Sequence, residues 1–177
     1  MKRTTSILLL LLAFGVAACN RPQPGSTIVL VVRHAEKASD AEDSPLAEAG
    51  VQRAQQLIQV AEEAGVSAIY CSQFKRNLDT ARPLSERTGV AITEMPVDLS
   101  TPGDYGKLLA KDILEKHRGQ TIVVVGHGNT IASTIEGLTG QAVPIEFVDY
   151  SDLLIVTVSP SGGGKLIKAK YGLKSGG

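Results

Sequence analysis

The chain has 177 residues, in which 18 lysines and arginines balance 18 aspartates and glutamates. This length suits one domain with a core of its own, and the 43% hydrophobic and 20% charged residues exclude wholesale disorder. A net charge of zero argues against general nucleic-acid binding, which takes a basic excess, so no nucleic-acid partner is expected.

The first residues resemble a bacterial lipoprotein signal. A basic start precedes an apolar stretch at 7–18 that is too short to span a bilayer comfortably. The stretch ends in Val16-Ala17-Ala18-Cys19, which is similar to the lipobox whose cysteine becomes lipidated. An ordinary secretory signal with a chance cysteine is the alternative.

We therefore expect a signal peptide at 1–18, a tether at 19–26 and one folded domain at 27–177. Acylated Cys19 would hold the exported protein, as a monomer, on a lipid bilayer of the bacterial envelope.

Strand and helix patterns alternate along the rest of the chain. Continuous apolar runs predict strands buried on both faces, and stretches of helical spacing that end at glycine predict helices. The first predicted helix opens at Ser44-Pro45, with the serine as its N-cap. The predicted strands are 28–32, 67–71, 90–94, 121–125, 153–158 and 165–171, and the predicted helices are 44–64, 74–88, 104–117 and 130–138.

This alternation predicts an α/β fold, a three-layer sandwich with a mostly parallel sheet. The last strand, 165–171, follows a glycine-rich turn and is expected to be an antiparallel edge strand. In open sheets of this kind, ligands bind beyond the carboxyl ends of the strands. The chemistry is therefore expected just after residues 32, 71, 94 and 125.

Two strand ends carry the same kind of side chain. Arg33 and His34 follow the first buried strand, and His127 follows the strand at 121–125. Arg76 lies in the first turn of the helix after the second strand. Guanidinium groups bind phosphate oxygens in a bidentate manner, and nearby cations lower the pKa of an imidazole, so these residues predict an anion pocket with a neutral histidine nucleophile.

These residues resemble the histidine phosphatase superfamily, also called phosphoglycerate-mutase-like. Arg33-His34-Ala35-Glu36 is similar to its Arg-His-Gly-Glu signature, with Ala35 in place of glycine. The second motif of the family is matched by Ser72-x-x-x-Arg76, and the third by Gly126-His127-Gly128. The start of the family's first helix is similar to Pro45-Leu46-x-x-x-Gly50.

The resemblance implies the same fold and a role for each residue. His34 would become phosphohistidine, His127 would stabilise the transferring group, and both would bind the phosphoryl group together with Arg33 and Arg76. Glu36 would orient neighbouring groups. Neither a metal nor an organic cofactor is implied.

The proton donor to the leaving group is less defined. The acidic context that larger members have after the third strand is missing, which makes the chain more similar to the short phosphohistidine phosphatases. Asp98 is the first candidate, because it lies on the loop at 95–103, followed by Glu94 and Asp104.

The predicted function is that of a phosphatase that transfers a phosphoryl group from a small-molecule or protein substrate to His34 and then to water. Three alternatives remain at this point. One is a phosphoglycerate-mutase-type phosphotransferase, and another is a non-catalytic lipoprotein that binds phosphorylated ligands. The third is a structural envelope protein, which would not need the Arg-His pairing.

Overall fold

Two apolar strands, β1 (Thr27–Arg33) and β4 (Thr121–Gly126), form the centre of a six-stranded sheet with the order β3-β2-β4-β1-β5-β6. Most of their side chains are buried, as expected for strands that are covered on both faces. The computed structural model describes residues 25–98, 100–144 and 148–173. The expected signal peptide and Cys19 lie outside these residues.

The remaining elements alternate as the sequence predicts. The other strands are β2 (Val66–Cys71), β3 (Ile92–Glu94), β5 (Asp152–Val158) and β6 (Gly164–Lys170). The helices are α1 (Glu48–Ala61), α2 (Lys75–Thr88), α3 (Pro102–Lys116) and α4 (Ile131–Thr139). Within the described part of the chain, none of the helices has the length and apolar character that crossing a membrane requires.

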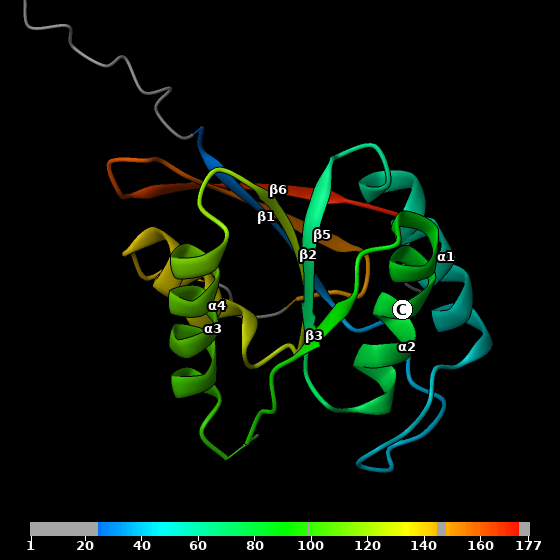
Figure 1. The fold of residues 1–177 in the computed structure, drawn as a ribbon. Helices are drawn as coiled ribbons and strands as arrows, with labels where there is room; N and C mark the ends of the chain where they lie inside the picture. The colour runs from blue at the N-terminus through cyan, green and yellow to red at the C-terminus, as the bar shows by residue number, and fades with distance from the viewer. Residues whose placement is uncertain (1–24, 99, 145–147, 174–177) are drawn as a thin grey trace, which may run out of the picture.

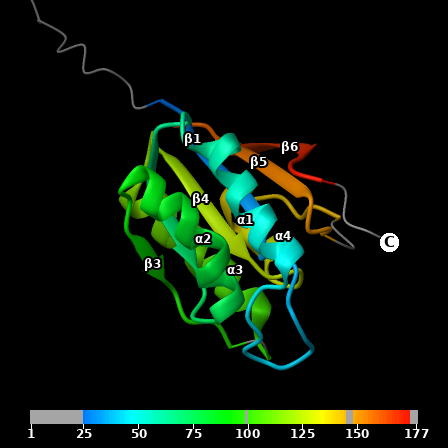
Figure 2. The ribbon, with the colours of Figure 1, turned by 90° about the vertical axis from the view of Figure 1, so that its right-hand side faces the viewer.

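The molecule has three layers (Figure 1). Helices α1 and α2 cover one face of the sheet, as the turned view shows, and α3 and α4 cover the other (Figure 2). Each face has its own apolar core: Leu57 and Leu84 pack under the first pair of helices, and Leu109 and Ile135 under the second. The predicted three-layer α/β fold is confirmed.

The direction of β5 departs from the mainly parallel pattern. Strands β1 to β4 run parallel, whereas β5 pairs antiparallel with β1, and β6 pairs antiparallel with β5. The predicted antiparallel edge strand is confirmed. Because β5 runs the other way, its first residues, not its last, lie at the edge where β1 ends.

The first helix begins later than predicted, at Glu48 rather than at Ser44. The chain before it is extended, because Lys37 and Leu46 form an antiparallel bridge and the Ala47 N–H donates to the carbonyl of Glu36 at 2.9 Å. The Ser44 hydroxyl accepts from the Ser39 N–H at 3.0 Å instead of capping the helix. Backbone groups committed to this bridge are unavailable to a helical turn.

Candidate active site

The carboxyl ends of β1 and β4 lie side by side and bring the two strand-end histidines together. Arg33 is in register with Gly126, and the His34 N–H donates to the Gly126 carbonyl at 2.9 Å. The rings of His34 and His127 are 5.5 Å apart, centre to centre, and both residues are buried.

Arg33 and Arg76 flank this pair. Arg76 is buried in the first turn of α2, with one Nη 3.4 Å from Nδ1 of His127 and the other donating to the Glu42 carbonyl at 2.5 Å. Arg33 donates to the Val148 carbonyl at 3.1 Å.

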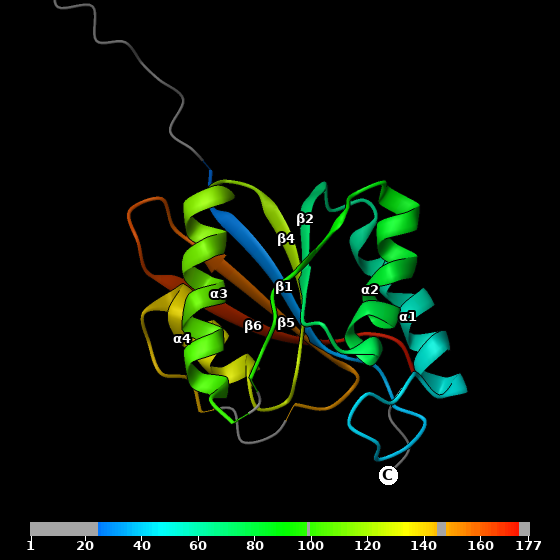
Figure 3. The ribbon, with the colours of Figure 1, turned by 60° about the horizontal axis from the view of Figure 1, so that its bottom comes forward.

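A cavity of about 180 Å³ opens at this point, and the loop that follows β1 forms its rim. Figure 3 shows that loop at the edge where β1 ends. The lining residues are Arg33, His34, Lys37, Asp40, Ala41, Glu42 and Arg76.

The hydrogen bonds of His34 define its reactive atom. Nδ1 is 2.8 Å from the Ala35 carbonyl oxygen, which can only accept, so Nδ1 carries the proton and Nε2 keeps its lone pair. Burial lowers the pKa of His34 to about 4, and the nearby Arg76 and Arg33 act in the same direction. At neutral pH His34 is therefore an uncharged imidazole whose Nε2 has a free lone pair.

His127 is oriented by two partners. A guanidinium can only donate, so Nδ1 of His127 accepts from Arg76, and its Nε2–H donates to the Ser72 hydroxyl at 2.8 Å. Burial lowers the pKa of His127 to about 3, and the cationic form of His34 and both arginines lower it further. Ser72 belongs to the quoted second motif, but the sequence did not reveal its contact with His127.

Side chains of α2 connect the two strand ends. The Thr80 hydroxyl accepts from the Ala35 N–H at 2.9 Å and donates to the Arg76 carbonyl at 2.7 Å. The Asn77 amide donates to the Val125 carbonyl at 2.9 Å. These bonds tie the residue after His34 and the end of β4 to α2.

Glu36 lies outside the cavity lining. Its carboxylate accepts from Arg53 of α1 at 2.6 Å, and the same guanidinium donates to the carbonyls of Tyr171 and Leu173. Glu36 therefore ties the loop after His34 to α1 and to the C-terminal segment. The sequence did not reveal this role of Arg53, because an arginine in an amphipathic helix usually lies on the exposed face.

The three candidates for the proton donor do not line this cavity. Asp98 is exposed, and its Oδ1 accepts from the N–H and the hydroxyl of Ser100 at 2.8 and 2.7 Å, which lowers its pKa. Glu94 lines a separate cavity beside Tyr70, and Asp104 is exposed in the first turn of α3. A lowered pKa is the opposite of what a general acid needs.

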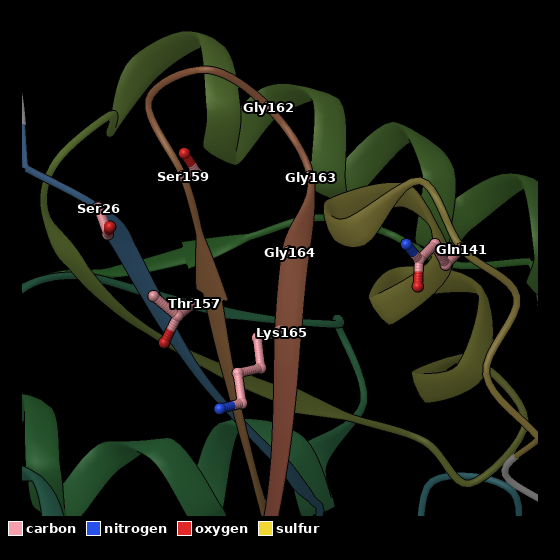
Figure 4. Close-up of a pocket in the computed structure, with 8 residues that line it drawn as sticks. All are labelled: Ser26, Gln141, Thr157, Ser159, Gly162, Gly163, Gly164 and Lys165. Carbon is pink, nitrogen blue, oxygen red and sulfur yellow. The ribbon is translucent and has the colours of Figure 1, made fainter.

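Another cavity, of about 400 Å³, lies elsewhere (Figure 4). It sits beside Ser26 and the β5–β6 turn, where Lys165 is the titratable side chain in its lining. Within the described ranges, no cluster of three or more histidines, cysteines and acidic residues is present that would hold a metal ion.

Comparisons with known proteins agree with this architecture. Residues 29–97 match the model of the histidine phosphatase superfamily, branch 1, a range that includes Arg33, His34 and Arg76 and ends before His127. No curated protein matches the sequence.

Several solved structures share the fold. YhfR of Bacillus stearothermophilus is 19% identical, with a TM-score of 0.66 over 79% of this chain and 95% of its own. A mycobacterial glucosyl-3-phosphoglycerate phosphatase is 15% identical, with a TM-score of 0.63 over 80% and 96%. The phosphoserine phosphatase of Entamoeba histolytica is 16% identical, with a TM-score of 0.62 over 83% and 98%. At these identities the likeness shows a common fold.

Proposed function

We propose that this chain is a phosphatase in which His34 accepts the phosphoryl group of a substrate and passes it to water. One observation carries the proposal. Nδ1 of a buried, neutral His34 is held by the Ala35 carbonyl, while the ring borders a cavity that Arg33 and Arg76 also line.

The reaction follows from these groups. Nε2 of His34 attacks phosphorus, an N–P bond forms, and the bond from phosphorus to the leaving oxygen or nitrogen breaks, with a proton going to the leaving group. Water then attacks the phosphohistidine, the N–P bond breaks, and phosphate departs. Arg33 and Arg76 neutralise the charge on the non-bridging oxygens in both steps.

The proposed substrate is a phosphate ester or a phosphohistidine. A cavity of about 180 Å³ is below the usual 300–1,000 Å³ of small-molecule sites, so most of the leaving group lies outside it. The small cavity supports a phosphatase of the short type, which recognises the phosphoryl group of the substrate more than its leaving group. Asp98 stays the sequence-based prediction for the proton donor.

The experiment is a screen of a phosphate-ester panel that includes an activated aryl phosphate, with excess chelator present. Wild type should release phosphate, and His34→Asn should lose turnover by three orders of magnitude or more. His117→Asn, a histidine at the end of α3 outside the cavity, is the matched control and should keep full activity.

Each alternative has its own signature in this assay. Formation of a substrate isomer without release of phosphate would indicate a mutase. Tight binding of phosphate without turnover would indicate a binding protein. Loss of activity on chelation, restored by zinc or magnesium, would mean that the histidines are metal ligands.

Export and lipid attachment at Cys19 are part of the proposal. They are supported by the similarity of Val16-Ala17-Ala18-Cys19 to a lipobox. Labelled palmitate should enter the wild-type protein and not Cys19→Ser. An unlabelled, secreted wild-type protein would indicate the ordinary secretory signal instead.

A further inference from the structure

The segment before β5 reaches the site from the side opposite to α2. Because β5 is antiparallel to β1, with Val32 in register with Leu153, the residues before β5 lie beside those that follow β1. Figure 3 shows this segment, in orange, at the same edge of the sheet as the loop after β1. Tyr150 belongs to this segment, two residues before the strand begins.

Tyr150 contacts both the nucleophile and a phosphate-binding arginine. Its ring centre is 5.9 Å from that of His34, and the guanidinium carbon of Arg33 lies 4.2 Å from the ring centre. This stacking is the geometry of a cation–π contact.

The hydroxyl group of Tyr150 is positioned to bind an anion. An Nη of Arg33 donates to the hydroxyl oxygen over a long 3.5 Å, and that oxygen still has its own proton to donate. Hydrogen bonds around a catalytic site are often long before substrate arrives and shorten when it binds. A phosphoryl oxygen bound by Arg33 would therefore lie within reach of this proton.

We propose that the Tyr150 hydroxyl is a further phosphoryl-binding group, which donates a hydrogen bond to a non-bridging oxygen held by Arg33. This inference rests on the proposed function, since it assigns a ligand to the same cavity. The hydroxyl lies beside Arg33, which would hold the non-bridging oxygens, and the ring lies beside that of His34. These positions favour a role in binding over a role in protonating the leaving group.

The test is Tyr150→Phe, which removes the hydroxyl and keeps the ring against Arg33 and His34. A hydrogen bond to a charged acceptor corresponds to a loss of about 10- to 100-fold in kcat/KM. This loss should be equal for an alkyl phosphate and an activated aryl phosphate, because binding a non-bridging oxygen does not depend on the leaving group. Inhibition by inorganic phosphate should weaken to a similar degree.

Tyr105→Phe is the matched control, because its buried hydroxyl forms no hydrogen bond within the described residues. It should leave activity, phosphate inhibition and the melting temperature unchanged. Tyr150→Phe should also keep the wild-type melting temperature, which separates a lost ligand from a lost fold.

Two results would overturn the inference: no change on either substrate, or a loss confined to the alkyl phosphate, which would make Tyr150 a proton donor. Calorimetric binding of inorganic phosphate separates this inference from the proposed function. If wild type binds phosphate without turning over any ester, and Tyr150→Phe binds it more weakly, the inference stands and the phosphatase proposal fails. If wild type neither turns over esters nor binds phosphate, both fail.

Discussion

Burial determines the charge of the two histidines at the candidate site. Because the folded chain excludes water from both rings, the pKa of His34 is lowered to about 4 and that of His127 to about 3. A histidine with such a low pKa is uncharged over most of the pH range in which proteins are stable. We expect carbon-detected NMR titration to show that neither imidazole gains a proton above pH 5.

The same shifts predict how stability depends on pH. In the unfolded chain both histidines bind a proton near pH 6.5, whereas in the folded chain His34 resists protonation until about pH 4 and His127 until about pH 3. The stability that they contribute is therefore complete above pH 6.5 and is lost as the pH falls toward 4, by roughly 3 kcal/mol for His34 alone. Urea unfolding should show this loss, and His127→Asn should flatten it. Equal stability at pH 7 and pH 4.5 would contradict the lowered pKa values.

Arg76 and Arg82 of α2 are expected to differ sharply in their contribution to catalysis. Arg76 is buried against His127 and the ring of Phe74, whereas Arg82 is 56% exposed and pairs with Asp79. Arg76→Ala should lower kcat/KM about 100-fold or more, since a charge-assisted bond contributes about 1.5–3 kcal/mol and a bidentate pair more. Arg82→Ala should stay within about twofold, because exposed pairs contribute little. A larger loss from Arg82→Ala would mean that the wrong arginine has been assigned to phosphate.

At the scale of single residues, the sequence correctly predicts the position of a side chain that directly follows a buried strand. Arg33, His34 and His127 are adjacent in space because β1 and β4 are adjacent and parallel. Asp98 was selected for its place on a loop, and the loop turns its carboxylate toward Ser100 instead. Tyr150 was missed because it precedes an antiparallel strand, and strand direction is not encoded in a pattern of apolar residues.

At the scale of the elements, the loop after His34 is held by its packing against the start of α1. A Cβ added to Gly50 would lie 2.3 Å from the Glu36 carbonyl oxygen, a backbone atom that has no room to move. This close approach requires glycine in the motif Pro45-Leu46-x-x-x-Gly50. The same contact between the loop and α1 allows residues 36–38 to pair with residues 45–47, so the helix begins only after this pairing.

Gly50→Ala should therefore destabilise the protein by about 1–3 kcal/mol, since overpacking forces the backbone to shift. It should also lower kcat/KM, because the shift is passed to the loop that carries His34. Gly103→Ala is the control in another helix: its added Cβ meets no atom within 4 Å, so it should be neutral or stabilising by up to about 1 kcal/mol. Equal effects of the two substitutions on urea unfolding would rule out the proposed contact.

In the whole molecule, the chain enters the sheet at the end opposite to the candidate site. β1 begins at Thr27, at the top of Figure 1, and Arg33 ends it at the opposite edge, roughly 20 Å away at about 3.3 Å per residue. The candidate site thus lies at the far end of β1 from Thr27, the first residue of the strand.

This geometry predicts that anchoring leaves catalysis on a water-soluble substrate unchanged. The membrane-bound wild type and a soluble form that begins at Gln23 should have kcat/KM values within about twofold of each other, since every described contact of the site lies after Ser26. The comparison requires vesicles and free protein at equal enzyme concentration. A loss of an order of magnitude in either form would indicate that the membrane contributes to the site.

In the proposed reaction, His34 carries the phosphoryl group. Rapid quench of the wild type with a labelled aryl phosphate, followed by peptide mapping, tests it directly. We predict an adduct on the peptide that contains His34, labile in acid and stable in base, which is absent from His34→Asn. An acid-stable adduct on Ser72 or Cys71, or steady turnover in His34→Asn, would contradict the claim.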